Sequence, residues 1–479
     1  MDQQNNYKLK IDFLLSNNIP LSHSTRTTPE TIFRICNECN QIREIFYKTD
    51  QICYPCYKAR TIPLSGNDVI DNFVRYTLTN NSDKREGKME FVLYDRFKNV
   101  EFNAEGGFSK IYKATWIDGP IVDWNEKKQK YNRYGEVTVA LKELNNSENI
   151  NSKELNELKI YYNFTLNWQP DEYVKRVCNS TNTSNFNNIN TYYGITQNPL
   201  TKNFMIITEY YELGNLTYYI ANNFFNMNWY EKIQILQDII SGLKNIHDAN
   251  IIHKDYHSGN ILIHNFYPSI TAAITGDLGL SKSAIESLND NNEIYGVIPY
   301  VAPEVFRGQK YTKASDIYSF GMIMWELMTG RKPFWDKSHD TDLIIKICDG
   351  IRPPIVENAS KVYIELMKEC WHSNPNKRPT ATELETNISS IWNDEPFYLY
   401  GSYYGSINPN GNINSADIGP IKINNPGAIY KSRPLSVMIK SAESTRNCLT
   451  NELVDNNINL SKYGNSDSDY MSEEINFDI

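Results

Sequence analysis

Short apolar runs come first and amphipathic runs come later in the middle of this chain. Residues 137–141 and 204–208 are short, apolar and rich in branched side chains, which predicts strands. In residues 229–247 apolar side chains recur every three or four positions on one stripe, which predicts an amphipathic helix. Residues 318–329 are apolar almost all round, which favours a helix at the centre of a domain. Strands followed by helices predict a two-lobed α+β unit rather than a doubly wound sheet.

Composition divides the chain of 479 residues into segments. A polar N-terminal segment at 1–30 precedes a candidate metal module at 31–62, and residues 97–393 carry the regular strand and helix signals. Residues 394–479 are rich in Asn, Ser, Gly and Tyr with few apolar clusters, which predicts a flexible, low-complexity tail. A polar interruption at 117–136 is predicted to be an extended loop.

Charge and hydropathy exclude several classes of protein. Lys and Arg number 48 and Asp and Glu number 57, so the formal net charge is −9. A general binder of nucleic-acid backbones needs a basic face instead. The most apolar stretch, 317–328, carries Glu326 and is shorter than the ~20 residues of a membrane-spanning helix. The first residues show no apolar run with a small-residue cleavage site. We therefore expect an intracellular, cytoplasmic protein with neither a nucleic-acid partner nor a membrane span.

Four cysteines near the N-terminus fall at a spacing typical of metal sites. Two residues separate Cys36 from Cys39 and Cys53 from Cys56, and thirteen residues lie between the two pairs. Two such pairs supply four thiolates to one tetrahedral ion, a ligand set that favours Zn²⁺ in a closed, structural site. The alternative is four unrelated buried or free cysteines. The spacing favours zinc, and so sparse a use of cysteine fits a reducing compartment.

A second set of residues fits the handling of phosphate groups. Residues 105–112 contain Gly106 and Gly107 and fit a hairpin whose backbone amides approach phosphates, although an ordinary β-turn would look the same. Lys142 ends a predicted strand, and Glu157 lies in a helical segment fifteen residues later. The two side chains can pair while the lysine ammonium reaches nucleotide phosphates.

Three further polar residues complete this set. Asp255 follows the amphipathic helix and can receive the proton of an incoming hydroxyl group. Asn260 and Asp277 offer the oxygen ligands that magnesium prefers. Such residues suit phosphoryl transfer, which needs positioning and charge neutralisation more than covalent chemistry. Each short motif alone has a simpler explanation, but together and in this order they indicate one site.

The order of these motifs resembles that of eukaryotic protein kinases. The resemblance covers about residues 97–393, and the segments DIYSFG (316–321), WEL (325–327) and NKRPT (376–380) are similar to those of the tyrosine-kinase-like group. The cysteine quartet, the GGFS loop and a terminal AIYKSRPL segment more loosely resemble an expanded fungal set of such kinases. The resemblance implies a small β-rich N-terminal lobe, a larger helical C-terminal lobe, and Mg²⁺-dependent transfer of the γ-phosphoryl group of ATP to protein hydroxyls.

By the same resemblance, individual residues take on roles. Lys142 holds the α- and β-phosphates and is oriented by Glu157, Asp255 is the catalytic base, and Asn260 and Asp277 hold magnesium. Together with Lys142, the residues expected to bind the nucleotide in the phosphate loop, the adenine pocket and the hinge are Ala104, Glu105, Gly106, Gly107, Phe108, Ser109, Ile111, Ala140, Thr208, Glu209 and Tyr211.

The resemblance implies structural roles as well. Arg378 is expected to pair with Glu304 below the substrate loop, and Asp316 is expected to anchor the backbone of the catalytic loop. His253 is expected to be a structural residue of the core rather than an acid or base.

Several positions depart from the kinase pattern. Ala104 and Ser109 replace two of the usual glycines of the phosphate loop, so weaker nucleotide binding or a stiffer loop is expected. Lys254 replaces the usual arginine, which weakens any anchoring of a phosphorylated activation segment. His257 and Val297 differ from the serine/threonine pattern, but the tyrosine-kinase signatures are absent there too. We expect protein substrates with serine or threonine hydroxyls, with tyrosine or dual specificity left open.

Two other functions stay open. A pseudokinase would keep the fold as a binding scaffold without turnover, which Ala104 and Ser109 favour and the intact Lys142, Glu157 and Asp255 oppose. A zinc-centred adaptor would recruit a partner through the N-terminal cysteine module or the C-terminal tail, alone or alongside kinase activity. Magnesium-dependent turnover of ATP separates an enzyme from a scaffold.

Overall fold

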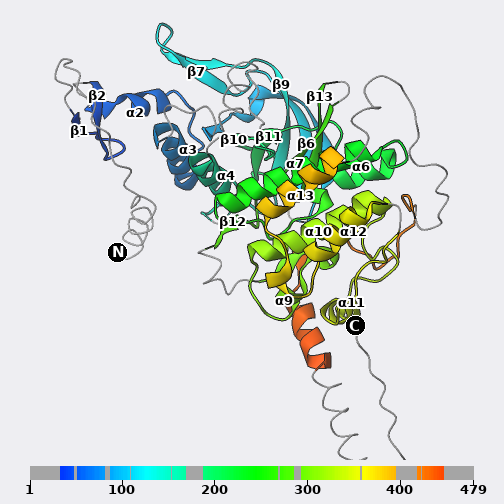
Figure 1. Cartoon of the computed structure of the whole chain (residues 1–479). Helices are drawn as coiled ribbons and strands as arrows, with labels where there is room; N and C mark the ends of the chain where they lie inside the picture. Colours follow the sequence, from blue (N-terminus) through cyan, green and yellow to red (C-terminus); the bar gives the residue numbers. More distant parts are fainter. Residues whose placement is uncertain are drawn as a thin grey trace, which may run out of the picture. The chain divides into compact units, whose positions relative to one another are not determined.

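Two units make up the chain in the computed structural model, Met1–Tyr57 and Lys58–Ile479 (Figure 1). Phe108 of the predicted phosphate loop and the N-terminal segment 1–30 lie outside the described residues. The structure describes residues 33–47, 51–80, 87–107, 109–152, 154–168, 187–267, 270–284, 293–356, 359–394, 418–421 and 423–446.

In the first unit, short antiparallel strands and a helix frame the cysteines. β1 (Phe33–Ile35) pairs with β2 (Ile42–Tyr47), which pairs with β3 (Ile52–Cys53), and α2 (Tyr54–Ala59) follows directly. Asn40, in the turn after β1, has a φ of +54°, a left-handed conformation that asparagine tolerates better than most residues. The buried cluster of this unit consists of Cys36, Ile52, Cys53 and Cys56.

The second unit begins with a β-rich lobe. Its sheet has six strands in the order β4-β10-β11-β9-β6-β5, in which only β4 and β10 run parallel. The strands predicted at 137–141 and 204–208 are confirmed as β9 and β11. The six strands are β4 (Glu90–Phe91), β5 (Phe97–Glu105), β6 (Ser109–Trp116), β9 (Val137–Leu144), β10 (Tyr192–Gln197) and β11 (Phe204–Glu209).

Two helices of this lobe pack against each other. α3 (Asp68–Asn80) lies in a segment to which the sequence assigned no element, and α4 (Asn156–Asn167) is the helix that carries Glu157. The rings of Phe73 and Tyr76 meet the ring of Tyr162 edge-on, with centroids 6.3 and 5.6 Å apart. Apolar residues spaced three or four apart give α3 a buried face: Ile70, Phe73, Val74 and Leu78.

The polar interruption at 117–136 contains a β-hairpin rather than the predicted loop. β7 (Ile121–Asn125) pairs antiparallel with β8 (Lys130–Arg133), and Trp124 packs edge-on against Tyr131 with ring centroids 5.0 Å apart. Such cross-strand aromatic pairs stabilise hairpins. The loop prediction was wrong because the charged residues between the two aromatic side chains obscured the alternation of apolar and polar residues that is typical of strands.

A larger helical lobe follows, with α7 (Trp229–Asp248) and α10 (Lys313–Thr329) at its centre (Figure 1). Both correspond to helices predicted from the sequence, and the two-lobed α+β prediction is confirmed. Within the described part of the chain, no helix is both long and apolar enough to cross a membrane. The other helices and strands of this lobe are α6 (Leu216–Asn223), β12 (Ile251–Ile252), β13 (Ile261–Tyr267), β14 (Ile270–Thr275), β15 (Lys282–Ser283), β16 (Tyr295–Gly296), α9 (Pro303–Phe306), α11 (Thr341–Cys348), α12 (Lys361–Cys370) and α13 (Ala381–Asp394).

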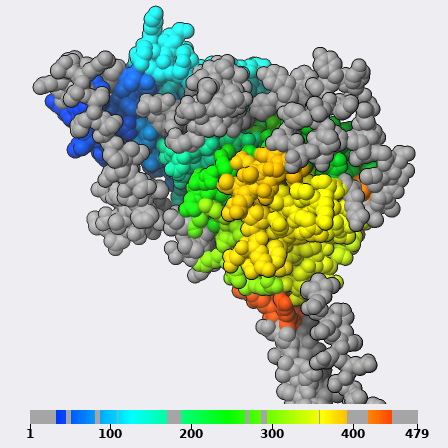
Figure 2. All heavy atoms as spheres, viewed as in Figure 1, coloured from blue at the N-terminus to red at the C-terminus, as the bar shows by residue number. Residues whose placement is uncertain are grey.

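Part of the predicted tail belongs to this lobe. β17 (Arg433–Pro434) is followed by helical residues 436–446, drawn in orange-red at the lower edge of the lobe in Figure 2. Leu435, Ile439 and Ala442 are buried in the same core as α7 and α10. A uniformly flexible tail is therefore wrong for these residues. Three apolar side chains three or four positions apart suffice to dock a helix, and the polar composition around them concealed this stripe.

Candidate active site

Lys142 lies between two carboxylates. Its Nζ donates to Oε2 of Glu157 at 2.8 Å and to Oδ1 of Asp277 at 2.7 Å. β9 carries the lysine and α4 carries Glu157, while Asp277 follows β14 in the other lobe. The predicted pair between Lys142 and Glu157 is confirmed, and the structure extends it across the two lobes to Asp277.

The charges of this cluster support one another. Burial lowers the pKa of Lys142, but the carboxylates of Asp277 and Glu157 outweigh burial and raise this pKa above its ordinary value. Burial raises the pKa of Glu157. Burial also acts to raise the pKa of Asp277, but the Lys142 ammonium outweighs it and the pKa lies below its ordinary value. The lysine therefore stays cationic and Asp277 stays anionic, as the binding of phosphate and metal requires.

Tyr192 of β10 joins this cluster, although no sequence pattern pointed to it. Its hydroxyl donates to Oε1 of Glu157 at 2.9 Å, and the backbone N–H of Leu278 lies 3.5 Å from the same hydroxyl oxygen. The side chain is buried. Tyr192 thus connects α4 with the segment that carries Asp277. A single tyrosine among 33 forms no motif, so the sequence offered no signal for this residue.

Asp316 of α10 holds the loop that carries Asp255. Its Oδ2 accepts from the backbone N–H of His253 at 2.9 Å, and its Oδ1 accepts from that of Lys254 at 3.0 Å. The predicted anchoring role of Asp316 is confirmed. The ring of His253 is fully buried, with Nε2 3.0 Å from the carbonyl oxygen of Gly276, which confirms its structural role.

His257 stands beside Asp255. Its Nε2 lies 3.6 Å from Oδ2 of Asp255, and its Nδ1 accepts from the backbone N–H of Gly259 at 3.0 Å. Burial acts to lower the pKa of His257, but the Asp255 carboxylate outweighs it and raises the pKa above its ordinary value. A protonatable ring therefore occupies the position where serine/threonine kinases usually carry a lysine.

Asn260 and Asp277 fit a magnesium ion. Nδ2 of Asn260 donates to the carbonyl oxygen of Asp255 at 2.9 Å, so the amide oxygen is the atom that can serve as a ligand. Asp277 has a φ of +54°, and its Oδ1 accepts from the backbone N–H of Gly279 at 3.2 Å. Amide and carboxylate oxygens are the ligands that magnesium prefers.

The expected nucleotide-binding residues lie on neighbouring strands and at the hinge that follows. A hydrogen bond of 2.8 Å from the N–H of Gly106 to the carbonyl oxygen of Ser109 closes the turn between β5 and β6. Ala140 pairs with Thr208 of β11, and it shares one face of β9 with Lys142 because side chains alternate along a strand. The expected residues that the structure describes here are Ala104, Glu105, Gly106, Gly107, Ser109, Ile111, Ala140, Lys142, Thr208, Glu209 and Tyr211.

Arg378 and Glu304 form a buried ion pair. Nη1 and Nη2 of the guanidinium each donate to one carboxylate oxygen at 2.6 Å, and Nη1 also donates to the carbonyl oxygen of Ala314 at 2.8 Å. The two side chains are 0% and 3% exposed. The predicted pairing of Arg378 with Glu304 is confirmed.

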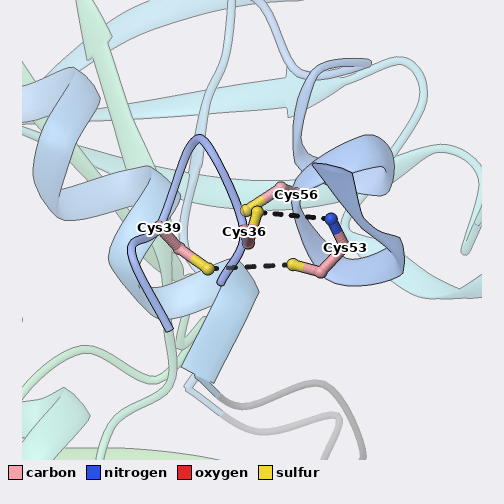
Figure 3. A group of neighbouring side chains, drawn as sticks. All are labelled: Cys36, Cys39, Cys53 and Cys56. Carbon is pink, nitrogen blue, oxygen red and sulfur yellow. Dashed lines mark hydrogen bonds between the residues drawn. The ribbon is translucent and has the colours of Figure 1, made fainter. Parts of the chain in front are cut away.

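The four N-terminal cysteines face one another in Figure 3. The sulfur atoms of Cys39 and Cys53 are 3.7 Å apart, and Sγ of Cys36 accepts from the backbone N–H of Cys53 at 3.2 Å. The Sγ atoms of Cys36, Cys39, Cys53 and Cys56 all lie within 4.8 Å of one another. Burial acts to raise the pKa of the buried thiols. Backbone hydrogen bonds outweigh it at Cys36 and lower its pKa to about 6, whereas burial raises the pKa of Cys53 to about 11 and also raises that of Cys56. A quartet of thiols this close fits a four-thiolate zinc site.

Comparison with protein families agrees with this geometry. Residues 100–388, more than half of the chain, match the family described as protein tyrosine and serine/threonine kinase. The fold and the cluster around Lys142 define a protein kinase domain, and the chain belongs to this kinase family.

Several curated proteins are similar to the chain over this domain. The dual specificity protein kinase splA of Dictyostelium discoideum is 31% identical over 199 residues, 39% of this chain and 8% of the relative. A protein of the same organism described as a probable serine/threonine-protein kinase, pats1, is 29% identical over 307 residues, 63% of this chain and 9% of the relative. Ephrin type-A receptor 5 of Gallus gallus is 32% identical over 195 residues, 39% of this chain and 18% of the relative. The chain thus spans less than a fifth of the length of these relatives.

Proposed function

We propose that the domain at 97–393 is an active protein kinase that transfers the γ-phosphoryl group of ATP to serine and threonine hydroxyls of proteins. The observation that carries this proposal is the simultaneous contact of Lys142 with Glu157 and Asp277. This arrangement provides a cation, Lys142, that can bind phosphates and an anion, Asp277, that can bind a metal ion. A scaffold that only binds partners has no need of it, so the geometry favours the enzyme over the pseudokinase.

In this proposal each residue of the cluster has one task. Lys142 neutralises charge on the α- and β-phosphates, and Glu157 keeps its ammonium in place. Asp255 accepts the hydrogen bond of the acceptor hydroxyl and then its proton. Asn260 and Asp277 would hold magnesium, which neutralises the charge of the phosphate oxygens when it is bound.

The choice of serine and threonine as acceptors rests on two observations. The relative pats1 is described as a probable serine/threonine-protein kinase. His257, whose pKa is raised beside Asp255, can supply in its protonated form the positive charge that a lysine supplies at this position in serine/threonine kinases. The name of the relative splA makes dual specificity the alternative outcome.

The test is phosphorylation of a mixed protein substrate by the whole chain with labelled ATP and magnesium. Asp255→Asn is expected to abolish the signal, whereas Asp342→Asn, at an exposed position on α11, is expected to leave it unchanged. Phosphoserine and phosphothreonine among the labelled amino acids would support the proposed acceptors, and phosphotyrosine alone would contradict them. Tight ATP binding without turnover in the wild type would favour the pseudokinase instead.

We also propose that Cys36, Cys39, Cys53 and Cys56 hold one structural Zn²⁺. The mutual distances of their sulfur atoms support this proposal, and four protein ligands would leave no open position for catalysis. Elemental analysis of the purified chain is expected to find about one zinc per molecule. Cys39→Ser is expected to lose the metal, whereas Cys348→Ala, outside the quartet, is expected to keep it. Zinc content unaffected by Cys39→Ser would contradict the proposal.

A further inference from the structure

A short segment near the C-terminus pairs with the activation segment, which runs from Asp277 to Glu304. β17 lies antiparallel to β16, with Pro434 opposite Tyr295 and Arg433 opposite Gly296. The pairing continues beyond the strands, because the N–H of Leu435 donates to the carbonyl oxygen of Ile294 at 2.7 Å.

Alternate side chains of this segment are held by the C-terminal lobe. Leu435 is 0% exposed and belongs to the core around α10. Nη2 of Arg433 donates to the carbonyl oxygen of His339 at 2.6 Å. Pro434 between them is exposed. Main-chain pairing with alternate side chains in pockets is the way in which extended peptides bind as an added strand.

The same segment reaches the phosphate loop. A β-carbon on Gly107 would lie 2.5 Å from the carbonyl oxygen of Ser432, so only a glycine allows the loop to approach this closely. The segment 431–436 is therefore bounded by the phosphate loop at Ser432 and by the activation segment at the residues that follow. In protein kinases the glycine-rich loop covers the phosphates of ATP, so Ser432 lies beside the loop under which the γ-phosphate is expected.

Ser432 differs from the other hydroxyl residues of this stretch. The hydroxyl of Tyr430 donates to the carbonyl oxygen of Pro333 at 2.9 Å, and Oγ of Ser436 accepts from the N–H of Ile294 at 3.0 Å. Oγ of Ser432 is buried and has no hydrogen-bond partner among the described residues. A buried polar atom without a partner is unfavourable, so this position favours a group that the protein itself does not supply.

We propose that residues 431–436 occupy the groove in which this kinase domain binds the acceptor segment of a protein substrate, and that Ser432 is phosphorylated within the same molecule. The proposal rests on the kinase activity proposed above. Oγ of Ser432 forms a bond to the γ-phosphorus of ATP while the bond from that phosphorus to the bridging β-phosphate oxygen breaks. ADP leaves with the electron pair of the broken bond, and the hydroxyl proton passes to the Asp255 carboxylate.

The first experiment measures where and how the chain phosphorylates itself. The whole protein is incubated with magnesium and labelled ATP over a hundredfold range of protein concentration, and the phosphorylated residues are mapped by mass spectrometry. Label at Ser432 with a first-order rate independent of protein concentration is expected. Ser432→Ala should remove this label, Ser444→Ala, an exposed serine of the following helix, should keep it, and Asp255→Asn should show none.

Three outcomes would overturn the proposal. Absence of label at Ser432, while an added protein substrate is phosphorylated, would leave the proposed function standing and remove only this inference. A rate at Ser432 that rises with protein concentration would show transfer between molecules rather than within one. Absence of label on both Ser432 and the added substrate would overturn the proposed kinase activity and this inference together.

A second experiment tests the docking itself. Leu435→Asp places a charge in the core and is expected to release the segment, so that labelling of Ser432 slows by at least about tenfold, the effect of about 1.4 kcal/mol. The KM for an added peptide is expected to fall, because the peptide no longer competes with the chain's own segment. Arg433→Ala leaves the buried leucine in place and should change both quantities in the same direction, by less. An unchanged KM in both variants, with folding verified by circular dichroism, would contradict occupation of the groove.

Discussion

The hydroxyl of Tyr192 donates a 2.9 Å hydrogen bond to one oxygen of Glu157, and the other oxygen of that carboxylate binds Lys142. Tyr192 stands on β10 and Glu157 on α4, so this bond ties the helix to the sheet without involving the lysine. A carboxylate held at both oxygens keeps a single orientation. Tyr192 is thus a positioning residue for the cluster around Lys142.

Tyr192→Phe removes this hydroxyl and keeps the ring. A hydrogen bond to a charged group contributes about 1.5–3 kcal/mol, so kcat/KM for ATP is expected to fall by roughly tenfold or more. Steady-state kinetics with a protein substrate check this. Tyr193→Phe is the matched control, because the ring of Tyr193 packs on Trp116 with centroids 6.1 Å apart. Equal kinetics for the two variants would exclude the positioning role.

Loss of the contact between α3 and α4 is expected to destabilise the protein. Phe73 is buried and meets Tyr162 edge-on, so Phe73→Ala leaves a cavity beside the helix that carries Glu157. Such truncations cost about 3–5 kcal/mol, and the free energy of unfolding in denaturant should fall by that order. Asn72→Ala, at an exposed position of α3, should change it little. A rise in the KM for ATP in Phe73→Ala alone would show that α3 also supports the active site.

The buried pair of Arg378 and Glu304 gives a sharper test of stability. Arg378→Met leaves the Glu304 carboxylate buried without its cation, which costs about 3–5 kcal/mol in comparable pairs. Lys346→Met, which breaks an exposed pair with Asp342 on α11, should change the free energy of unfolding little, because solvent screens such a pair. Denaturant unfolding measures both. Adding Glu304→Gln to Arg378→Met is expected to recover part of the loss, and a double variant as unstable as the single one would count against an electrostatic cause.

Glu326 is expected to make stability depend on pH. Burial raises its pKa from 4.5 to about 8, and Oγ of Ser258 donates to its Oε1 at 3.0 Å. The folded protein therefore keeps a proton that the unfolded chain releases, so this contribution is complete below pH 4.5 and is lost as the pH rises towards about 8. In Glu326→Gln the decline in the free energy of unfolding across this range should be smaller by a few kcal/mol, because each pKa unit corresponds to about 1.4 kcal/mol. Glu365→Gln, at an exposed position, should leave the pH profile as it is.

The sequence was sufficient to predict structural features that depend on local patterns of residues. Apolar periodicity predicted α7, because a helix that packs one face on a core repeats its apolar side chains every three or four residues. A stretch that is apolar almost all round predicted α10 as a buried helix. The order of short motifs allowed Lys142, Glu157 and Asp277 to be proposed for one site, although 135 residues separate the first from the last. Here the residue types themselves carried the information, since few combinations serve phosphate and metal.

Features that depend on distant packing were not predictable in this way. Tyr192 gains its role from a helix 35 residues away, and nothing in its own neighbourhood marks it. The segment around Leu435 lies among Asn, Ser and Gly, so its composition indicated a tail. The segment is ordered because Leu435 pairs with Ile294 and because its apolar side chains complete the core of the C-terminal lobe.

The folded domain extends beyond its family match. Residue 388 is the last residue matched, yet Leu435, Ile439 and Ala442 complete the core around α10. A recombinant protein that ends at residue 394 would expose to water the apolar side chains that this segment covers. The carbonyl oxygen of Ile294 would also lose its hydrogen bond from the N–H of Leu435. Exposed apolar surface of this kind promotes self-association. Aggregation or inactivity of a truncated domain would therefore be a consequence of the missing segment. The catalytic activity of this kinase has to be measured on a chain that reaches at least residue 446.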